Sequence, residues 1–280
     1  MIAHERWGRI FFCPTPLGNL KDITLRVLDV LRQVDTIVCE DTRVTLKLLT
    51  HYQIRKPLMS YRSQNRVTAT RRIMEILESG KNLAFVSDAG MPGIQDPGCD
   101  LIRTLQEKGV VFEVLPGPSS LLLGVVYAAF PDPGFTFLGF LPRKGSERRR
   151  LLEKSLFAPF SVVIYEAPHR LRETLKDIRA VVEDSRKVVL LRELTKFHEE
   201  IQRGTIDEVL LDVSSRTVKG EVILIIEGKK KEEGVSLPLA KLVEALEKRG
   251  FTNKEIVAML SEGLSLKKGF IKKKLPGRVS

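Results

Sequence analysis

The sequence predicts an α/β protein made of two α/β domains and a small helical appendage. Short apolar runs of strand type alternate along the chain with segments whose leucines repeat at helical spacing, which is typical of βα units. The 280 residues are 43% hydrophobic, enough apolar material for two cores of ordinary domain size. Composition changes after residues 131–134 (PDPG), and residues 229–234 (KKKEEG) are typical of a linker. We therefore expect domains at residues 1–118 and 119–230, and the appendage at 231–280.

In the first half, each predicted strand leads into a loop rich in glycine, proline or charge. The predicted strands are residues 9–13, 36–39, 58–61, 83–86 and 110–115. Helical spacing follows them, first at Leu25, Leu28 and Leu31, where Asp22 or Thr24 can serve as the N-cap. Ligands of open α/β sheets bind beyond the carboxyl ends of the strands, so the residues after each strand are candidate site residues.

Residues 83–98 (LAFVSDAGMPGIQDPG) are the stretch around which we expect the site to be organised. A short buried strand leads into a loop that contains three glycines, two prolines and two aspartates. Glycine lets a backbone approach a ligand closely, and Pro92 and Pro97 stiffen the loop. A plain strand-to-helix connection is the alternative, but such connections usually need only about 2–6 residues.

Two other strand exits carry polar groups. Residues 40–43 (EDTR) follow one strand, and helix capping with an Asp41–Arg43 ion pair is the alternative to a site there. Residues 116–120 (PGPSS) open an apolar helix that ends before Pro131. Hydroxyls and free backbone amides at that point can cradle a ligand, although N-capping by Ser119 explains them equally well.

The second half repeats the pattern, with strands predicted at residues 135–141, 161–165, 188–191 and 221–227. Their exits deliver residues 142–150 (PRKGSERRR), 166–170 (EAPHR) and 192–200 (RELTKFHEE), and residues 203–205 are expected to start a short helix. The five cations within 142–150 are candidates for phosphate contact, with a solvated helix face as the alternative. In the appendage, helical spacing at 239–246 and 254–260, a third segment near Ser265 and a basic tail are compatible with a nucleic-acid module.

The formal charge of +11 is unevenly distributed. Residues 1–140 carry 16 lysines and arginines against 14 acidic residues, a net of +2, which leaves 30 against 21, a net of +9, for residues 141–280. We infer that the second half meets an anionic partner; a merely solvated, lysine-rich surface is the alternative.

Several classes of protein are disfavoured. Cys13, Cys39 and Cys99 stand far apart, so we expect neither a disulfide framework nor a metal site. The N-terminus lacks the apolar core of a signal peptide, and the longest nearly unbroken apolar run, residues 121–130, is too short to span a bilayer. We therefore expect a cytoplasmic protein without membrane association. P-loop, GxSxG, HExxH and GxGxxG sequences are absent.

Seven motifs, in order along residues 9–228, closely resemble the bacterial small-subunit ribosomal RNA 2′-O-methyltransferase I family. They are PTPLGNLKDITLR (14–26), CEDTR (39–43), VSDAGMPGIQDPG (86–98), LPGPSS (115–120), GFLPRKG (139–145), YEAPHRL (165–171) and RELTKFHEE (192–200). The resemblance implies the tetrapyrrole-methylase fold, in which two α/β domains enclose S-adenosylmethionine in the cleft between them, and commonly a homodimer. It also implies methyl transfer to the ribose 2′-hydroxyl of a cytidine in the decoding region of 16S rRNA, within the small ribosomal subunit.

The same resemblance carries residues over to a cofactor pocket, and we expect it to be lined by Leu17, Ala89, Gly90, Met91, Ile94, Ser119, Ser120, Glu166, Ala167, Leu194 and Val222. Asp41, Asp88 and Lys196 lie at strand exits and are candidates for the base or an orienting partner, and the sequence does not rank them. The candidate RNA contacts are Arg43, Arg143, Lys144, Arg148, Arg149, His169 and Arg170.

Two other functions stay open at this point. A methyltransferase acting on an acidic tetrapyrrole would use the same fold and also favour cations, but it would not need the basic tail. A non-enzymatic RNA- or DNA-binding protein could act through its C-terminal helices alone. Cofactor binding after deletion of residues 235–280 separates the enzyme from the pure binder.

Overall fold

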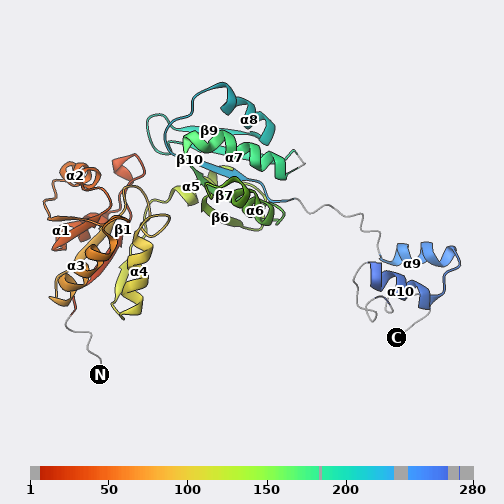
Figure 1. Ribbon diagram of the computed structural model, residues 1–280, viewed down its shortest axis with the longest axis horizontal. Coiled ribbons are helices and arrows are strands. Elements are labelled where there is room, and N and C mark those ends of the chain that lie inside the picture. Colours follow the sequence, from red (N-terminus) through yellow and green to blue (C-terminus); the bar gives the residue numbers. More distant parts are fainter. Residues whose placement is uncertain (1–6, 183–184, 230–238, 264–270, 272–280) are drawn as a thin grey trace. The chain divides into compact units, whose positions relative to one another are not determined.

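The computed structural model describes residues 7–182, 185–229, 239–263 and 271 (Figure 1). The chain divides into two compact units, residues 1–229 and 230–280, and the larger unit contains two five-stranded sheets. The separate boundary expected at residue 118 lies inside the larger unit, between the last strand of the first sheet and the helix that follows it, and stays a prediction. The expected linker from residue 230 on and the third segment near Ser265 lie outside the described residues.

The first sheet is parallel throughout, with the strand order β3-β2-β4-β1-β5. Its strands are β1 (Ile10–Cys13), β2 (Thr36–Cys39), β3 (Leu58–Ser60), β4 (Leu83–Val86) and β5 (Phe112–Val114). Leu83 of the central strand pairs with both Ile10 and Thr36, so the loops after β1, β2 and β4 leave the same edge of the sheet as neighbours.

Helices cover both faces of this sheet. On one face, α1 (Leu25–Gln33) and α2 (Thr42–His51) bury Val27, Leu31 and Leu49 against the strands. On the other face, α3 (Arg66–Glu78) and α4 (Gly98–Glu107) bury side chains such as Ile73 and Leu101. Thr24 caps α1 by accepting the Val27 amide hydrogen, whereas Asp22 lies in a preceding 3₁₀ turn (Leu20–Asp22). Of the two predicted N-caps, Thr24 is the one used.

The second sheet is mixed, with the strand order β6-β7-β10-β8-β9. Its strands are β6 (Phe135–Phe140), β7 (Ser161–Glu166), β8 (Lys187–Arg192), β9 (Glu200–Thr205) and β10 (Val222–Ile226). Helix α5 (Ser120–Ala128) packs on one face, and α6 (Gly145–Leu156), α7 (Pro168–Val181) and α8 (Ile206–Ser215) provide the core on the other. Because β10 runs antiparallel to both neighbours, its first residue, Val222, pairs with Glu166 and Arg192 at the ends of β7 and β8.

Strand β9 corrects the prediction for residues 203–205. Those residues were expected to start a helix, but they complete an edge strand that is antiparallel to β8. Helix α8 begins one residue later, where Thr205 and Glu208 form a capping box. The sequence EIQRGT has one strongly apolar residue and two charges, a composition tolerated at a sheet edge and poor as a strand signal.

Arg148 corrects a predicted RNA contact. Its side chain is 1% exposed and lies between α6 and α7, where it donates to Asp177 at 2.7 Å and to Glu173 at 2.6 Å. A guanidinium enclosed in this way cannot reach a phosphate, so the prediction is wrong for this residue. The ion pair instead fastens α6 to α7.

We expect Arg148→Ala to lower the free energy of unfolding by about 3 kcal/mol, because it removes the closest charged partner of the nearly buried Asp177 carboxylate, which then keeps only the longer contact of 3.4 Å from Arg149. Arg150→Ala is the matched control, since that exposed side chain on the same helix makes no ion pair with a described residue and should change stability by less than about 1 kcal/mol. Urea unfolding of both variants measures the difference, and equal losses would contradict the role assigned to Arg148.

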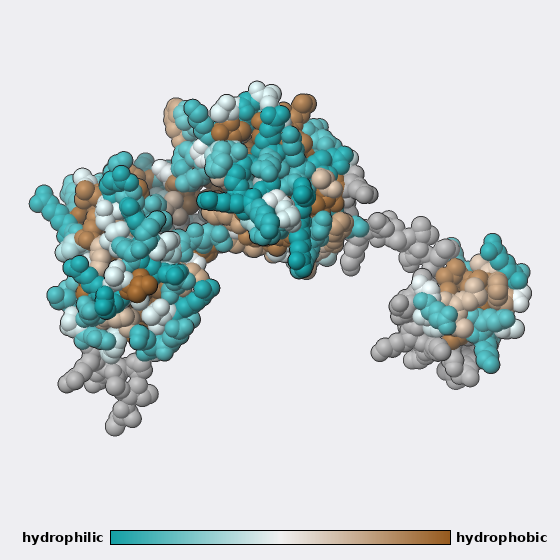
Figure 2. Space-filling view, in the orientation of Figure 1, coloured by the Kyte–Doolittle hydropathy of each residue, from teal (hydrophilic) through white to brown (hydrophobic). Residues whose placement is uncertain are grey.

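The smaller unit contains α9 (Leu239–Lys248) and α10 (Asn253–Gly263). Val243, Ile256, Val257, Leu260 and Ile271 form its core. Hydrophobic colouring gathers over this unit in Figure 2, whereas hydrophilic residues cover most of the visible face of the larger unit. Within the described part of the chain, no helix combines the length and the apolar character needed to cross a membrane.

Candidate functional site

A cavity of about 420 Å³ lies where the strand-end loops of the two sheets meet. The first sheet contributes Leu17 after β1, Glu40 after β2, and Ser87, Asp88, Ala89, Ile94, Gln95 and Asp96 after β4. The second sheet and α5 contribute Ser120, Phe140, Tyr165, Glu166, Ala167, Pro168, Leu191, Leu194, Gly220, Glu221, Val222 and Ile223. The expected convergence of strand exits on one cavity is therefore present, and β10 joins by its amino end because it runs antiparallel.

Backbone contacts join the loop after β4 to the loop after β1. Thr15 and Gly90 exchange two amide hydrogen bonds of 3.0 Å, and the Thr15 hydroxyl donates to the Ser87 carbonyl. Gly90 has a φ of +78°, and a Cβ there would lie 3.0 Å from the Leu17 side chain. A glycine suits this position because its φ lies in the left-handed region and because a Cβ would force the Leu17 side chain to shift.

Asp96 shapes the far end of the same loop. Its carboxylate accepts the amide hydrogens of Gly93 and Gly98, and burial raises its pKa. The neighbouring Gln95 accepts the amide hydrogen of Phe140 at 3.3 Å, which joins this loop to β6 of the second sheet. Gly139 makes room for that contact, since a Cβ there would lie 2.2 Å from the Gln95 amide nitrogen.

The two candidate aspartates are in very different states. Asp41 accepts three hydrogen bonds from Arg43, whose guanidinium and amide hold the pKa of that carboxyl well below its usual range. Asp88 lines the cavity, accepts the Asp41 amide hydrogen at 3.0 Å, and has its pKa raised, first by burial and then by the charge of Asp41. Asp88 is therefore the better proton acceptor of the two.

Lys196 lies beside the cavity but not in its lining. Its ammonium contacts Glu193 at 2.9 Å and Glu221 at 3.2 Å, and although burial opposes the charge, these carboxylates raise its pKa overall. A lysine with a raised pKa is a poor base, because it holds its proton at neutral pH. The Lys196 side chain instead packs against Gly18, and a Cβ at that glycine would lie 2.2 Å from Lys196 Cγ. This contact joins the loop after β1 to the second sheet.

On the second-sheet side, polar side chains are held in place by their neighbours. Ser120 and Tyr165 share a hydrogen bond of 2.8 Å. Glu166 is buried and accepts hydrogen bonds from the Thr174 hydroxyl and the Ala167 amide. The wall that these residues form is thus set by α5, β7 and α7.

Eight of the expected cofactor residues line the cavity: Leu17, Ala89, Ile94, Ser120, Glu166, Ala167, Leu194 and Val222. The lining does not include Gly90, Met91 and Ser119. Gly90 bonds to the Thr15 backbone, and Ser119 caps α5 by accepting the Leu122 amide hydrogen, which is the simpler reading of that serine. Contact of any of these residues with a cofactor stays a prediction.

The expected RNA contacts fall into two groups. Arg43, Arg143, Lys144, Arg149 and His169 are exposed. Arg170 is only 16% exposed and donates to the carbonyls of Leu141 and Pro142, so like Arg148 it serves the protein's own structure. The exposed residues stay candidates.

The cavity's charge is opposite to that of the chain. Its described lining holds five carboxylates, those of Glu40, Asp88, Asp96, Glu166 and Glu221, and no lysine, arginine or histidine. Burial, followed by the charge of Asp88, raises the pKa of Glu40. Such a lining favours a cationic ligand and repels phosphate. Among the described residues, no group of three or more histidine, cysteine, aspartate or glutamate side chains is placed so that it could hold a metal ion.

Several lining residues were missed by the sequence analysis as candidates. Gln95 and Phe140 come together only through the contact between β6 and the loop after β4, and residues 220–221 enter only because β10 is antiparallel. Tyr165 and Glu40 belonged to recognised motifs, and their position at strand ends was the available signal.

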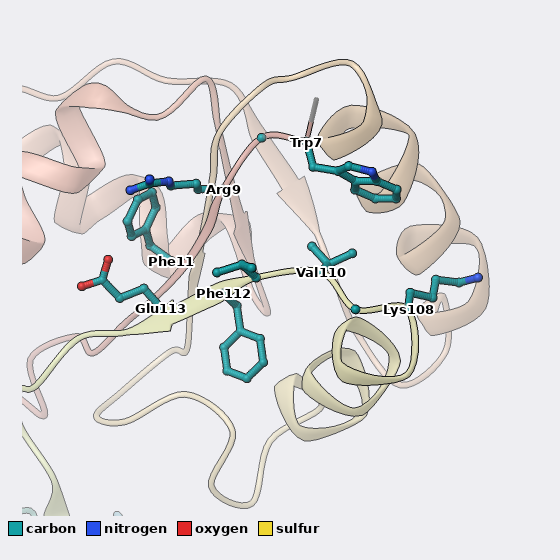
Figure 3. Close-up of a pocket in the computed structure, with 10 residues that line it drawn as sticks. Trp7, Arg9, Phe11, Lys108, Val110, Phe112 and Glu113 are labelled. Carbon is teal, nitrogen blue, oxygen red and sulfur yellow. The ribbon is translucent and has the colours of Figure 1, made fainter. Parts of the chain in front are cut away.

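A larger cavity, of about 580 Å³, lies elsewhere (Figure 3). Its labelled side chains come from β1, β5 and the segments that precede them, including Trp7, Arg9 and Lys108. These are the amino ends of parallel strands, opposite to the edge where ligands of such sheets bind. We therefore do not assign the site to this cavity, despite its volume.

Comparison with known proteins matches residues 9–210 to the family described as Tetrapyrrole (Corrin/Porphyrin) Methylases. The Ribosomal RNA small subunit methyltransferase I of Coprothermobacter proteolyticus is 46% identical over 217 residues, which are 78% of this chain and 96% of that protein. The protein of the same name from Bacillus subtilis is 39% identical over 257 residues, 89% of this chain and 88% of that one. The crystal structure of uroporphyrin-III C-methyl transferase from Thermus thermophilus complexed with S-adenyl homocysteine has a TM-score of 0.58 at 17% identity, and the match covers 79% of this chain and 97% of that one.

Proposed function

The chain belongs to the tetrapyrrole methylase family and, within it, to the ribosomal RNA small subunit methyltransferase I proteins, and we propose that it methylates the ribose 2′-hydroxyl of a cytidine in the decoding region of 16S rRNA. The motifs had indicated this family, and the relatives confirm it. S-adenosylmethionine is the cofactor of the family. The proposal includes a homodimer acting on the small ribosomal subunit in the cytoplasm.

The observation that carries the proposal is the carboxylate-lined cavity between the loops of both sheets. S-adenosylmethionine supplies an electrophilic methyl group on a positively charged sulfur. The residues present fit that group, since carboxylates alone supply the formal charge of the described lining and Leu17, Leu191 and Leu194 supply apolar surface. Ser120, Glu166 and Ala167 are the second-sheet residues that we assign to holding it.

Asp88 is the residue to which we assign proton removal from the acceptor hydroxyl. It is the candidate that both lines the cavity and has a raised pKa, which brings a carboxylate closer to the range useful for a general base. Asp41 is held ionised by Arg43 and fixes Asp88 through its amide, and Lys196 is held protonated by two glutamates. Methyl transfer needs little else from the protein than alignment and this proton acceptor.

A tetrapyrrole substrate is the second candidate, because the solved structure of similar fold is that of a uroporphyrin-III C-methyl transferase. The same carboxylate lining argues against it for this chain, since a tetrapyrrole with several carboxylates would meet Glu40, Asp88 and Asp96, none of which has an ion-pair partner among the described residues. The other two carboxylates of the lining, Glu166 and Glu221, are paired with Arg170 and Lys196. A ribose hydroxyl carries no charge and meets no such barrier.

The proposal is tested by incubating the purified protein with labelled S-adenosylmethionine and either 30S subunits from cells lacking the gene or a uroporphyrin. We expect label in 16S rRNA at one cytidine 2′-oxygen, located by ribose-methylation mapping, and none in the tetrapyrrole. Label in the tetrapyrrole alone, or a protein that binds RNA without transferring methyl, would refute the proposal.

The carboxylate lining should select the charged donor over its neutral demethylated product. We expect Glu40→Gln to weaken S-adenosylmethionine binding by about tenfold, or about 1.4 kcal/mol, and to change S-adenosylhomocysteine binding by less than about twofold. Calorimetry at pH 8 measures both constants. Glu107→Gln on the exposed side of α4 is the control, and equal weakening of both ligands by Glu40→Gln would show that its charge has no part in selection.

Asp88→Asn should lower kcat by about 10²-fold or more, because the amide keeps an acceptor for the Asp41 amide hydrogen but cannot take a proton. In the unaltered protein, kcat should fall as pH is lowered through the Asp88 pKa, and that fall should lie above the range of an ordinary aspartate because burial raises the value. Single-turnover rates between pH 5 and 9 provide the measurement. A variant that keeps its kcat and its pH profile would remove Asp88 from the role of base.

A further inference from the structure

A second cavity, of about 480 Å³, adjoins the first and shares Pro168 and Gly220 with it. It is bounded by the first turn of α7, the end of α8 and the segment that leads into β10. Its lining residues are Pro168, His169, Arg172, Val213, Ser214, Arg216, Thr217, Val218, Lys219 and Gly220.

The two adjoining cavities have opposite charge. The described lining of the first holds five acidic side chains and no basic one, and that of the second holds Arg172, Arg216, Lys219 and His169 and no acidic one. Two adjoining cavities of opposite charge favour a ligand that is cationic or neutral at one end and anionic at the other. An RNA strand fits that description, because its ribose hydroxyls are neutral and its phosphates each carry one negative charge.

Two of these cations are not used within the protein. Arg216 is committed to Glu200 and Asp212, and these contacts raise its pKa. The side chains of Arg172 and Lys219, by contrast, make no hydrogen bond or ion pair with any residue that the structure describes. Two cations that line one cavity without a described counter-ion repel each other, and a bound anion would relieve that repulsion.

Hydroxyl groups complete the polar lining. Ser214 and Thr217 line the same cavity, and hydroxyls together with arginine and lysine are the usual partners of phosphate oxygens in RNA and DNA complexes. The first cavity repels phosphate, so a nucleotide whose ribose enters it must leave its backbone outside. The second cavity provides the positive charge directly at that exit.

We propose that the cavity lined by Arg172 and Lys219 binds a backbone phosphate of the RNA next to the nucleotide that is methylated. This inference rests on the proposed function and extends it, because it identifies where the strand runs as it leaves the donor cavity. It adds α7 and the segment before β10 to the places where phosphate contact is expected, beside the exposed cations at the start of α6, of which the buried Arg148 is no longer one.

The test compares Arg172→Gln/Lys219→Gln with Lys154→Gln/Lys176→Gln, a double variant that loses the same charge from exposed positions on α6 and α7. Binding of a fluorescent single-stranded RNA that contains the 16S target segment is measured in 50 to 300 mM KCl. We expect the first variant to bind about tenfold more weakly at 100 mM KCl, with its slope of log affinity against log salt reduced by about 1. The control variant should keep the slope, and both should keep their affinity for S-adenosylmethionine.

The remaining outcomes decide against the site. Equal loss in both double variants would mean that only net charge matters, and an unchanged slope in the first variant would mean that no phosphate binds there. Calorimetry with inorganic phosphate provides a further arm, in which submillimolar binding that the first variant abolishes would identify a free-phosphate site instead of an RNA contact. RNA binding needs no turnover, so a protein that never methylates 16S rRNA would refute the proposed function while the salt slope still decides the phosphate site.

Discussion

The pairing of Thr15 with Gly90 is the constraint on which the site depends. It joins the loops after β1 and β4, two adjacent parallel strands, and therefore fixes Leu17 and Asp88 on the same wall. The pairing requires a glycine with positive φ, a nearby hydroxyl to tie down the Ser87 carbonyl, and no side chain between the loops. Two further contacts join these loops to the second sheet. Gln95, in the loop after β4, accepts the amide hydrogen of Phe140, and Lys196, which follows β8, packs against Gly18 in the loop after β1.

Charge separation explains how one protein can hold a cationic donor and an anionic RNA. The chain has a formal charge of +11, yet the described lining of its donor cavity is acidic. Partly buried carboxylates interact strongly with a bound charge, because little water screens them. Exposed cations are screened by water and salt, so each of them interacts more weakly with a ligand. In the function proposed above, the acidic lining disfavours phosphates inside the cavity, and the net positive charge of the chain attracts the RNA.

The sequence alone was sufficient for the elements whose signals are local. The exits of β1, β2, β4, β7 and β8 were predicted within a residue or two, because each ends an apolar run before glycine, proline or charge. Strand β9 was missed because its residues EIQRGT carry no alternating apolar pattern, and its edge position depends on pairing with β8. Arg148 looked like one of five equivalent cations, since its burial depends on Asp177, 29 residues further along the chain. Contacts between residues far apart in the chain, such as that of Gln95 with β6, cannot be predicted from the residues next to them in the sequence.

The division into two units bears on which part of the chain carries the chemistry. All described residues that line the cavity to which we assign donor binding lie between Leu17 and Ile223, inside the larger unit. The match to the Coprothermobacter relative spans 217 residues, which are 96% of that protein. That relative is therefore about as long as the larger unit of this chain, residues 1–229. The described lining of the cavity contains no residue of α9 or α10, and Val243, Ile256 and Leu260 pack these two helices against each other in a core of their own.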